Sequence, residues 1–334
     1  MRFKPLIQSA TLAVMLALGA PCVHADRAAE PGPRAALVER AIATAEAAVA
    51  NPAFVKGESW ANFTAILRDP ATQALDDDDF RRAFNDAAEA LPFTHFRLKW
   101  QSPPTPAGEA EAMISLEWPR EDVALVRIRM FEGDPAEFSE ILATVIERQP
   151  RALIIDLRGN PGGSFPTAVA LSRALHRDAL DAGAFLARGW FDRHGDYPSA
   201  DQYEAIEALD ELDLAAYARK LRNDGAARLI LPAHDEPIFE GQTLILVDGD
   251  TASTCEPLAR RLQESGIPIL GERTAGAMLS AEHFPLDDTL RLFVPVADYV
   301  TPSLERLDRR GVEPDIEVAA EAALDRALAL IDES

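Results

Sequence analysis

The sequence predicts an α/β fold preceded by a region of helices. Two continuous apolar runs, at residues 152–157 and 243–247, are typical of strands buried on both faces of a parallel sheet. A helix-like segment follows each run, at 166–175 and 256–264, and this alternation favours right-handed strand–helix–strand crossovers. Residues 34–91 are instead Ala-rich, with apolar side chains three and four positions apart, which indicates amphipathic helices.

The remaining elements follow in chain order from the same patterns. A Pro-rich connector at 101–108 ends the helical region. We expect strands at 112–118, 123–130 and 268–270, and a helix at 136–148. Residues 178–240 interrupt the alternation with a charged helical stretch, which we interpret as a cover over a cleft.

The composition suits a folded chain and excludes one class of partner. The 334 residues are 48% hydrophobic, which is enough to build a sizeable core. The net charge of −22 argues against nucleic acid, because affinity for the phosphate backbone depends on Lys and Arg. After the N-terminal segment, no stretch is long and apolar enough for a membrane helix, so we expect no membrane insertion.

The first 25 residues have the pattern of a cleaved signal peptide. Arg2 and Lys4 give a basic start, and the apolar run at 10–20 is too short to span a bilayer. Small residues favour cleavage after Ala25, which predicts a periplasmic or secreted protein.

Cysteine content leaves little room for covalent cross-links. Cys22 raises the alternative of a lipid anchor, which Pro21 disfavours because a small residue is expected there. Cleavage leaves Cys255 as the single cysteine, so we expect no intramolecular disulfide.

The sequence predicts four parts of the chain. Residues 1–25 are the signal peptide and 26–100 an N-terminal helical domain. Residues 110–320 are the α/β core, with the helical insertion at 178–240, and 321–334 are a C-terminal helix.

A serine stands where the second buried strand turns into a helix. The sequence Thr-Ala-Ser-Thr-Cys-Glu at 251–256 follows that strand and places Ser253 at the helix N-terminus. Free backbone N–H groups and the positive end of the helix dipole stabilise developing negative charge there. This position suits a serine nucleophile, whereas Cys255 is expected to be buried in the packing.

A glycine-rich turn at 159–163 follows the first buried strand. Such a turn exposes backbone N–H groups, so Gly162 or Gly163 can donate to an oxyanion together with the N–H of Thr254. A tight turn with no ligand is one alternative. A phosphate-binding loop is another, but the turn has neither the Gly-Lys-Ser/Thr ending nor the dinucleotide fingerprint.

Four ordered motifs carry a family resemblance. They are ALIIDLRGNPGG at 152–163, LILVDGDTASTCE at 244–256, ILGERTAGA at 269–277 and GVEPDIEV at 311–318. With them the chain resembles the tail-specific, or C-terminal-processing, serine peptidases, in the branch nearer the tricorn core and the interphotoreceptor retinoid-binding repeats. The resemblance covers about residues 120–320 and implies a crotonase-like core sheet of ββα units with flanking helices.

The resemblance assigns Ser253 as nucleophile and Glu256 as its partner position. One branch of the family takes its general base from a lysine downstream, but the matching turn at 274–278 contains no lysine. That branch also carries a PDZ domain ahead of the core, for which the interval after Phe96 leaves no room. A Ser–Lys dyad is therefore not expected.

The tricorn-like branch uses a histidine from a Ser-His pair, and Thr94-His95 stands at the matching place. The resemblance implies that His95 is the general base and that Thr94 orients its ring. A histidine pKa close to working pH suits this role. Taken without the resemblance, a histidine between aromatic residues is more often a packed core side chain. His283 is the alternative base.

The family often carries an acidic residue three positions before the Gly-Val of the last motif, which is Asp308 here. We expect this carboxylate to orient His95 or the cleft. Glu305 and Glu313 are nearby alternatives, and a plain surface carboxylate is the remaining interpretation.

These observations predict an exported serine-type peptidase that cleaves peptides or unfolded proteins through an acyl-enzyme. The histidines lack metal-ligand spacing, so neither a metal nor a cofactor is expected. The alternative is a non-catalytic module that binds an apolar ligand or a peptide on the same fold, and an acyl hydrolase acting on other substrates is a third option. The sequence does not predict an oligomeric state.

Overall fold

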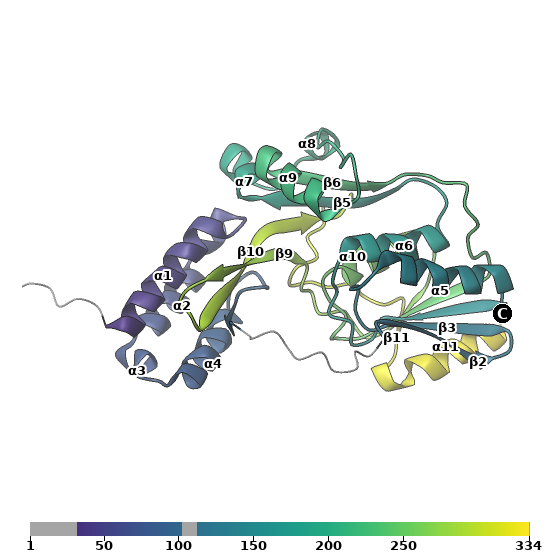
Figure 1. Cartoon of the computed structure of the whole chain (residues 1–334), viewed down its shortest axis with the longest axis horizontal. Helices are drawn as coiled ribbons and strands as arrows, with labels where there is room; N and C mark the ends of the chain where they lie inside the picture. The colour runs from purple at the N-terminus through teal and green to yellow at the C-terminus, as the bar shows by residue number, and fades with distance from the viewer. Residues whose placement is uncertain (1–31, 102–111, 334) are drawn as a thin grey trace, which may run out of the picture.

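The computed structural model describes residues 32–101 and 112–333 (Figure 1). The predicted signal peptide, its cut after Ala25 and Cys22 lie outside these residues. The expected α/β class with an N-terminal helical region is confirmed. Within the described ranges, no helix has the length and apolarity needed to cross a membrane.

The N-terminal region is built of short helices that share an aromatic core. They are α1 (Pro33–Ala48), a 3₁₀ turn (Pro52–Val55), α2 (Glu58–Arg68), α3 (Pro70–Gln73) and α4 (Asp77–Ala88). The acidic run before α4 caps it, since the Asp76 carboxylate accepts the Asp79 N–H at 2.8 Å. Phe63 contacts Phe84 and Phe96 edge-on, with ring centroids 5.2 and 5.6 Å apart.

A six-stranded sheet forms the α/β core, in the order β11-β8-β7-β4-β3-β2. Its strands are β2 (Ile114–Arg120), β3 (Val123–Ile128), β4 (Ala152–Asp156), β7 (Gln242–Val247), β8 (Ile269–Gly271) and β11 (Ile316–Glu317). All neighbours pair in parallel except the edge strand β2. The residues of β4 are all buried, as a continuous apolar run predicts.

Helices cover both faces of this sheet. One face packs against α5 (Pro135–Arg148), α6 (Phe165–Leu175) and α10 (Cys255–Glu264), and the other packs against α11 (Ala323–Glu333) after a 3₁₀ turn (Ala320–Ala322). Figure 1 shows α5 and α6 above the strands and α11 below them. The carboxyl ends of β4 and β7 therefore open into turns at one edge of a buried sheet.

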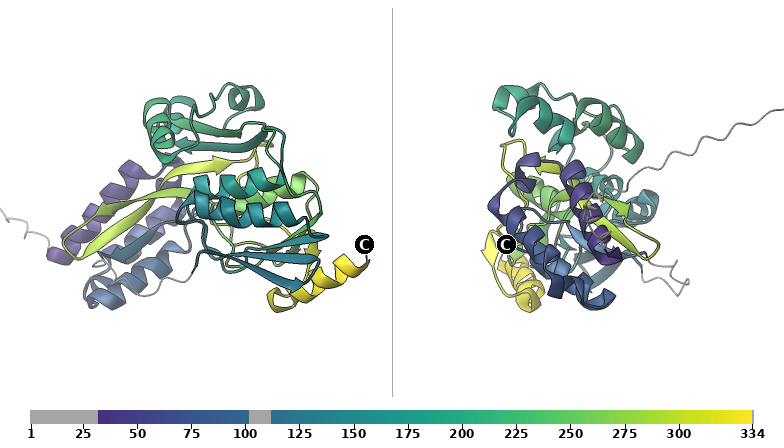
Figure 2. Two further views of the ribbon diagram at one scale, coloured as in Figure 1. Left: turned by 45° about the vertical axis from the view of Figure 1, so that its right-hand side comes forward. Right: turned by 90° about the vertical axis from the view of Figure 1, so that its left-hand side faces the viewer.

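A second, antiparallel sheet lies between the N-terminal helices and the core. Its order is β1-β10-β5-β6, with β9 also paired to β10. The strands are β1 (Arg97–Trp100), β5 (Leu180–Ala187), β6 (Ala226–Leu231), β9 (Leu279–Pro285) and β10 (Leu290–Val300). The left view of Figure 2 places the N-terminal helices at one end of the molecule and α11 near the other.

The segment 178–240, expected to be a helical insertion, contains strands as well as helices. Between β5 and β6 it carries α7 (Arg188–His194), α8 (Ala200–Glu204) and α9 (Leu214–Asp224). β5 pairs with β10, so the segment completes the second sheet rather than only covering it. β5 lacks the alternation of large apolar side chains that indicates a strand, because it contains small residues. Gly183 leaves space for the Tyr299 ring, since a Cβ on Gly183 would lie 2.3 Å from the Tyr299 hydroxyl oxygen.

Candidate active site

The turn between β7 and α10 holds Ser253 in a left-handed backbone conformation, with φ of 56°. Such a conformation costs a non-glycine residue about 1–3 kcal/mol and persists where neighbouring bonds impose it. Here the Ser253 N–H donates to the Ala277 carbonyl at 3.1 Å and to Glu256 Oε2 at 3.1 Å. Its hydroxyl donates to no acceptor within the described chain and lines an open cleft.

Glu256 is fully buried at the start of α10 and accepts four hydrogen bonds. Beside Ser253, its donors are Thr274 Oγ1 at 2.6 Å, the Gly276 N–H at 2.8 Å and the Ala277 N–H at 2.9 Å. Burial raises the pKa of this carboxyl, and these hydrogen bonds oppose the rise. Glu256 therefore ties the 274–277 turn to the serine turn through backbone contacts.

The glycine turn after β4 lies against the serine turn. Asn160 is fully buried, donates to the Ile128 carbonyl at 2.9 Å, and accepts the Gly162 N–H at 2.9 Å. The Asn160 carbonyl accepts the Ala252 N–H at 2.9 Å, which joins the two turns. A Cβ on Gly162 would lie 2.5 Å from the Ser253 Cβ, so this position requires glycine.

Two backbone N–H groups beside Ser253 have no acceptor among the described residues. They belong to Gly163 and Thr254, whose Oγ1 donates to the Gly163 carbonyl at 2.6 Å. The Gly162 N–H is already bonded to Asn160, so of the two glycines Gly163 is the one with a free donor. Free N–H groups on either side of a serine are the groups that an oxyanion would bind.

The candidate base comes from the other side of the cleft. Thr94 and His95 lie between the N-terminal helices and β1, and His95 also has a left-handed backbone, with φ of 57°. His95 Nδ1 lies 2.9 Å from Thr94 Oγ1. Thr94 Oγ1 donates to Asp308 Oδ1, and the Thr94 N–H donates to Asp308 Oδ2 at 3.2 Å.

Asp308 is buried, and Arg306 Nη2 lies 2.8 Å from its Oδ2, while the same guanidinium also pairs with the buried Asp298 at 2.9 Å. Burial raises the pKa of Asp308, while Arg306 and the Thr94 donors lower it. An ionised carboxylate only accepts, so it takes the single hydroxyl proton of Thr94. His95 Nδ1 must then donate to Thr94, which leaves Nε2 unprotonated and able to accept a proton.

The protonation equilibrium of His95 favours the neutral ring. Burial lowers its pKa from 6.5 to about 4, and the positive charges of Lys99 and Arg97 act in the same direction. A neutral imidazole is the form that a general base requires.

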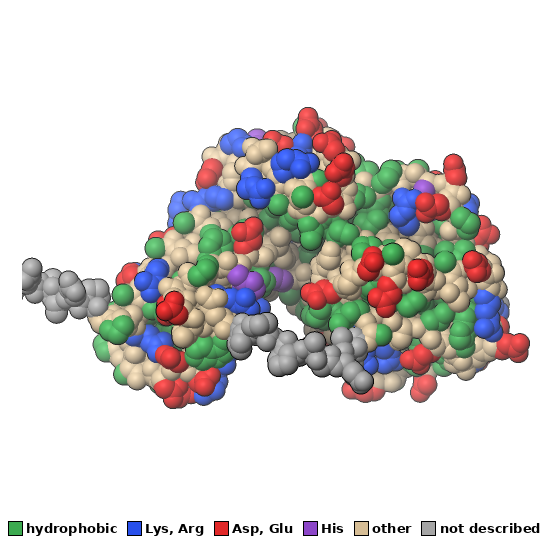
Figure 3. Space-filling model, viewed as in Figure 1, with side chains coloured by type: hydrophobic (Ala, Val, Ile, Leu, Met, Phe, Trp, Pro, Cys, Tyr) green, Lys and Arg blue, Asp and Glu red, His purple; other side chains and the backbone are tan. Residues whose placement is uncertain are grey.

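Ser253 and His95 line one cleft of about 480 Å³, together with Gly162, Gly163 and Thr254. Within the described chain no hydrogen bond joins the Ser253 and His95 side chains. The cleft runs between the two sheets, and Figure 3 shows histidine and basic side chains at the hollow between the two halves of the molecule.

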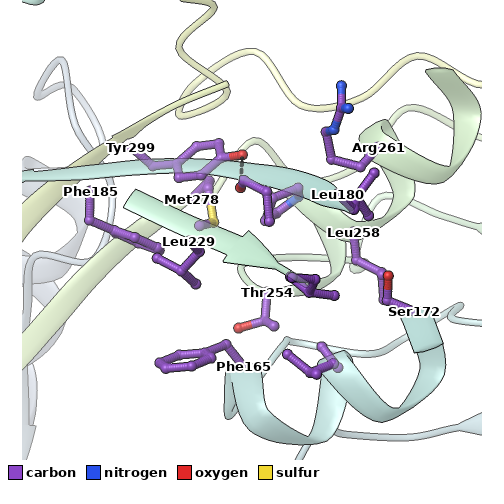
Figure 4. Close-up of a pocket in the computed structure, with 15 residues that line it drawn as sticks. Phe165, Ser172, Leu180, Phe185, Leu229, Thr254, Leu258, Arg261, Met278 and Tyr299 are labelled. Atoms are coloured by element: carbon purple, nitrogen blue, oxygen red, sulfur yellow. Dashed lines mark hydrogen bonds between the residues drawn. The ribbon is translucent and has the colours of Figure 1, made fainter. Parts of the chain in front are cut away.

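A smaller apolar chamber of about 60 Å³ adjoins the cleft (Figure 4). The two cavities share the side chains of Phe165, Phe185, Thr254 and Met278. Leu180 and Leu229 from the inserted segment close the chamber, with Tyr299 above them. An apolar side chain of a ligand bound next to Thr254 would enter this chamber.

The other candidates make no hydrogen bond to Ser253, Thr94 or His95 among the described side chains, although His283 packs on Phe293, the ring that His95 also contacts. Glu305 pairs with Arg260 at 3.3 Å, and Glu313 pairs with Arg273. His283 is exposed and stacks on Phe293 at 4.7 Å between ring centroids. Cys255 is buried with Sγ 3.5 Å from the Asn160 carbonyl oxygen, and burial raises its pKa far above that of a free thiol.

Sequence reasoning missed two residues of the site. Arg306 neutralises Asp308, and Lys99 lines the cleft beside His95. The placement of Arg306 two residues before Asp308 is a local signal that was available, whereas Lys99 reaches the cleft only through strand pairing. Among the described residues, no group of His, Cys, Asp and Glu side chains is arranged to hold a metal ion.

Fold and cleft together define an α/β protein in which a serine at a strand–helix turn lines the same cleft as a histidine that lies just before β1 of the second sheet. Residues 122–318 match the model of peptidase family S41, and the chain belongs to that family. It is 27% identical over 199 residues to a carboxyl-terminal-processing protease of Picosynechococcus, and 29% identical over 194 residues to the chloroplastic carboxyl-terminal-processing peptidase 3 of Arabidopsis thaliana.

Each of these matches covers 58% of this chain but only 39% and 31% of the two relatives. Solved structures show the same fold over most of the chain. A lipoprotein of Streptococcus agalactiae has a TM-score of 0.55 at 16% identity and covers 91% of this chain and 98% of its own. The photosystem II D1 C-terminal processing protease has a TM-score of 0.53 at 15% identity, covering 87% and 95%.

Proposed function

We propose that this protein is an exported serine-type peptidase in which Ser253 is the nucleophile and His95 the general base. The observation that carries the proposal is the hydrogen-bonded chain Asp308–Thr94–His95, which ends in the cleft that Ser253 lines. Membership of peptidase family S41 supports peptide or protein substrates.

In the proposed mechanism, His95 Nε2 takes the hydroxyl proton as Ser253 Oγ attacks a peptide carbonyl. The oxyanion is stabilised by the N–H groups of Gly163 and Thr254, and Gly162 lets the serine turn pack closely against the glycine turn. The imidazolium that forms keeps its Nδ1 proton on Thr94, and Asp308 stabilises that charge through the hydroxyl. His95 then returns a proton to the leaving amine, and water hydrolyses the acyl-enzyme.

Glu256 acts in this scheme as a positioning residue, since all four of its donors belong to the turns around Ser253. The serine and histidine must approach each other when substrate binds. Catalytic hydrogen bonds are often long in unliganded enzymes, and the cleft between two sheets permits such closure.

The direct test is labelling by a fluorophosphonate probe. Wild type should be labelled, whereas Ser253→Ala and Ser253→Gly should not. The glycine variant matters because it removes the hydroxyl while tolerating a positive φ. Ser164→Ala removes another hydroxyl from the same cleft and should label as wild type does. Equal labelling of wild type and both Ser253 variants would refute the nucleophile assignment.

A non-catalytic module that binds apolar ligands or peptides is the second candidate. The apolar chamber beside Thr254 favours it, because such a chamber can hold a ligand side chain without any reaction. Under this alternative, wild type binds apolar peptides but neither reacts with the probe nor cleaves them.

Export is proposed on the basis of the first 25 residues alone. N-terminal sequencing of the protein recovered from outside the cytoplasm should begin at Asp26. Recovery of the full-length chain in the cytoplasm would overturn this part of the proposal.

A further inference from the structure

Two cations face each other on the cleft side of the second sheet. In the antiparallel pairing of β1 with β10, Lys99 lies directly opposite Arg291. Their neighbours Leu98 and Leu292 point to the other face and join the core of the N-terminal helices. Like charges directly opposite in an antiparallel pair destabilise the sheet, so this pairing has an energetic cost.

No carboxylate within the described residues offsets this cost. Neither Lys99 nor Arg291 forms an ion pair there, whereas Arg97 on the same strand pairs with Glu89 at 2.9 Å. The Nε of Arg291 is buried and has no acceptor in the described chain. The Lys99 ammonium lies 4.2 Å from the centroid of the Phe293 ring, which positions the charge without neutralising it.

The effect of the two cations extends to their neighbours. Burial lowers the pKa of Lys99, and Arg291 lowers it further. Burial likewise lowers the pKa of His283, with Arg291 and Lys99 adding to the effect. In a chain with a net charge of −22, an unpaired positive site of this kind is a local exception.

One member of this pair lies in the cleft where a substrate would lie. Lys99 lines the cleft that holds Ser253 and His95, and it also lines a second cavity of about 300 Å³ that His95 borders as well, while Arg291 stands opposite Lys99 in the strand register. Of the described residues that line the main cleft, Glu132 is the one carboxylate, and it belongs to the segment after β3. An anionic group of a bound peptide can therefore reach Lys99 while a carbonyl lies at Ser253.

Building on the peptidase function proposed above, we propose that Lys99 and Arg291 bind a carboxylate of the peptide substrate. Lysine and arginine donors form charge-assisted hydrogen bonds with carboxylates, and a bound carboxylate removes the repulsion between the two cations. The carboxylate is either the free C-terminus of the peptide or an Asp or Glu side chain. Both have the same chemistry, and a set of matched peptides separates them.

Binding is measured on the Ser253→Gly variant, which holds the peptide without turnover. The probes are acetyl-Ala-Ala-Ala-Leu-Ala with a free carboxylate, the same peptide as an amide, and an amide with Glu in the last position. We expect the free acid or the Glu amide to bind about tenfold more tightly than the plain amide. The tighter of the two identifies the source of the carboxylate, and equal binding of all three would overturn the proposal.

Matched variants then assign the effect to the two cations. Lys99→Gln and Arg291→Gln should each reduce the preference for the carboxylate peptide over the plain amide to near unity. Lys99→Arg should retain the preference. Lys56→Gln, which removes an exposed lysine from the N-terminal region, should not alter it. Thermal denaturation checks that each variant is folded.

A failure of the carboxylate site can be distinguished from a failure of the proposed peptidase activity. If wild type cleaves the plain amide but shows no carboxylate preference, this inference fails and the peptidase assignment stands. If wild type cleaves nothing yet binds the carboxylate peptide through Lys99, the peptidase assignment fails and the carboxylate site stands. Loss of binding to both peptides in Lys99→Gln would show a general role in packing and refute a carboxylate site.

Discussion

The hydroxyl of Thr94 has one proton, and the geometry around Asp308 determines where it goes. Because the carboxylate accepts it, the histidine must supply the Nδ1 proton, and the free lone pair of Nε2 belongs to the cleft. A threonine fills this role as well as a serine would, since only the hydroxyl is used. The added methyl group restricts the rotation of the side chain.

Removing the hydroxyl of Thr94 should therefore lower turnover without unfolding the protein. Thr94→Val preserves the shape of the side chain but breaks the connection between His95 and Asp308. We expect kcat to fall by roughly 10²-fold, the lower range for loss of assistance to a general base. Thr94→Ser keeps the hydroxyl and should retain most activity. Peptide hydrolysis rates measure both, and unchanged turnover in Thr94→Val would contradict the assigned proton positions.

Asp308 stands at the other end of the hydrogen-bonded chain that leads through Thr94 to His95. Asp308→Asn keeps the size of the side chain, but its amide can donate to Thr94 and so reverse the direction of the hydrogen bonds. Turnover should fall by roughly 10²–10⁴-fold, as when a triad carboxylate is replaced. Glu305→Gln, a matched change away from the cleft, should have little effect. Comparable losses in the two variants would contradict the role of Asp308.

The pKa of His95 predicts an unusual pH profile. Because burial and nearby cations lower it from 6.5 to about 4, the base stays neutral until the pH falls to about 4. The acid limb of kcat/KM should therefore lie near pH 4 rather than 6.5. Between these values the unfolded chain binds more protons at this site, so its contribution to stability rises with pH. A limb at 6.5 that disappears in His95→Gln would show that the ring is not buried in solution.

Two turns that follow β4 and β7 lie together at the proposed nucleophile site. The Asn160 carbonyl joins them by accepting the Ala252 N–H, and the buried Glu256 carboxylate ties the serine turn to the 274–277 turn by accepting from Thr274 and Gly276. The sequence motifs contain glycine and small residues at these turns because larger side chains would not fit where the two backbones pack together.

A methyl group at Gly162 should disable the site without removing any reacting group. Its Cβ would lie 2.5 Å from that of Ser253, and its φ of +102° adds backbone strain. Gly162→Ala should lower kcat/KM by at least about 10²-fold through displacement of the serine. Gly159→Ala is the control in the same turn, because its Cβ meets nothing within 4 Å even though its φ is positive. Hydrolysis rates that fall equally in both would mean that backbone strain alone is responsible.

The buried carboxylate of Glu256 should contribute to the stability of the folded protein. Glu256→Gln replaces an acceptor of four hydrogen bonds with a group that must turn a donor toward some of them. We expect a loss of about 2–4 kcal/mol in the free energy of unfolding, since buried donors lose their partner. Chemical denaturation measures it, and a loss within 0.5 kcal/mol, about that of a surface change, would contradict the buried network.

Across the whole molecule, β10 connects parts that the sequence separates. It pairs with β1 over Leu290–Phe293 and with β5 over Ala297–Val300, and β9 pairs with it from Arg291 to Asp298, so the strand that follows His95 and the inserted segment share one sheet. The serine belongs to the other sheet. A substrate bound in the cleft would therefore contact residues that both sheets position.

Deleting residues 178–240 should consequently destroy the fold rather than only change substrate preference. The deletion removes β5 and β6 and exposes the apolar surface of β10, including Tyr299. We expect an insoluble or protease-sensitive product, and a stable, folded deletion product would contradict this expectation.

Access to the cleft is better tested by Leu214→Ser, because this side chain is 54% exposed and lines the cleft. That variant should stay folded with a raised KM for apolar peptides.

The parallel core was predictable because its strands are buried on both faces and leave continuous apolar runs. The second sheet was not. β9 is half exposed, β10 contains Pro295 and a bulge before Ala297, and β5 uses Ala and Gly where large partners fill the space. The serine and glycine turns carry local signals in sequence, whereas the contact of Thr94 with Asp308 joins residues 214 positions apart and depends on the tertiary fold. The Lys99–Arg291 pair required the strand register.

Thr94 and Ser253 are both synthesised before Asp308, the residue that accepts the Thr94 hydroxyl proton in the folded protein. A ribosome finishes the serine turn long before it adds Asp308, and until then nothing accepts the Thr94 proton or fixes the ring of His95. An unfinished or partly threaded chain would possess a serine without a prepared base. Under the proposed mechanism, proteolytic competence would therefore appear only after nearly the entire polypeptide has been synthesised and folded.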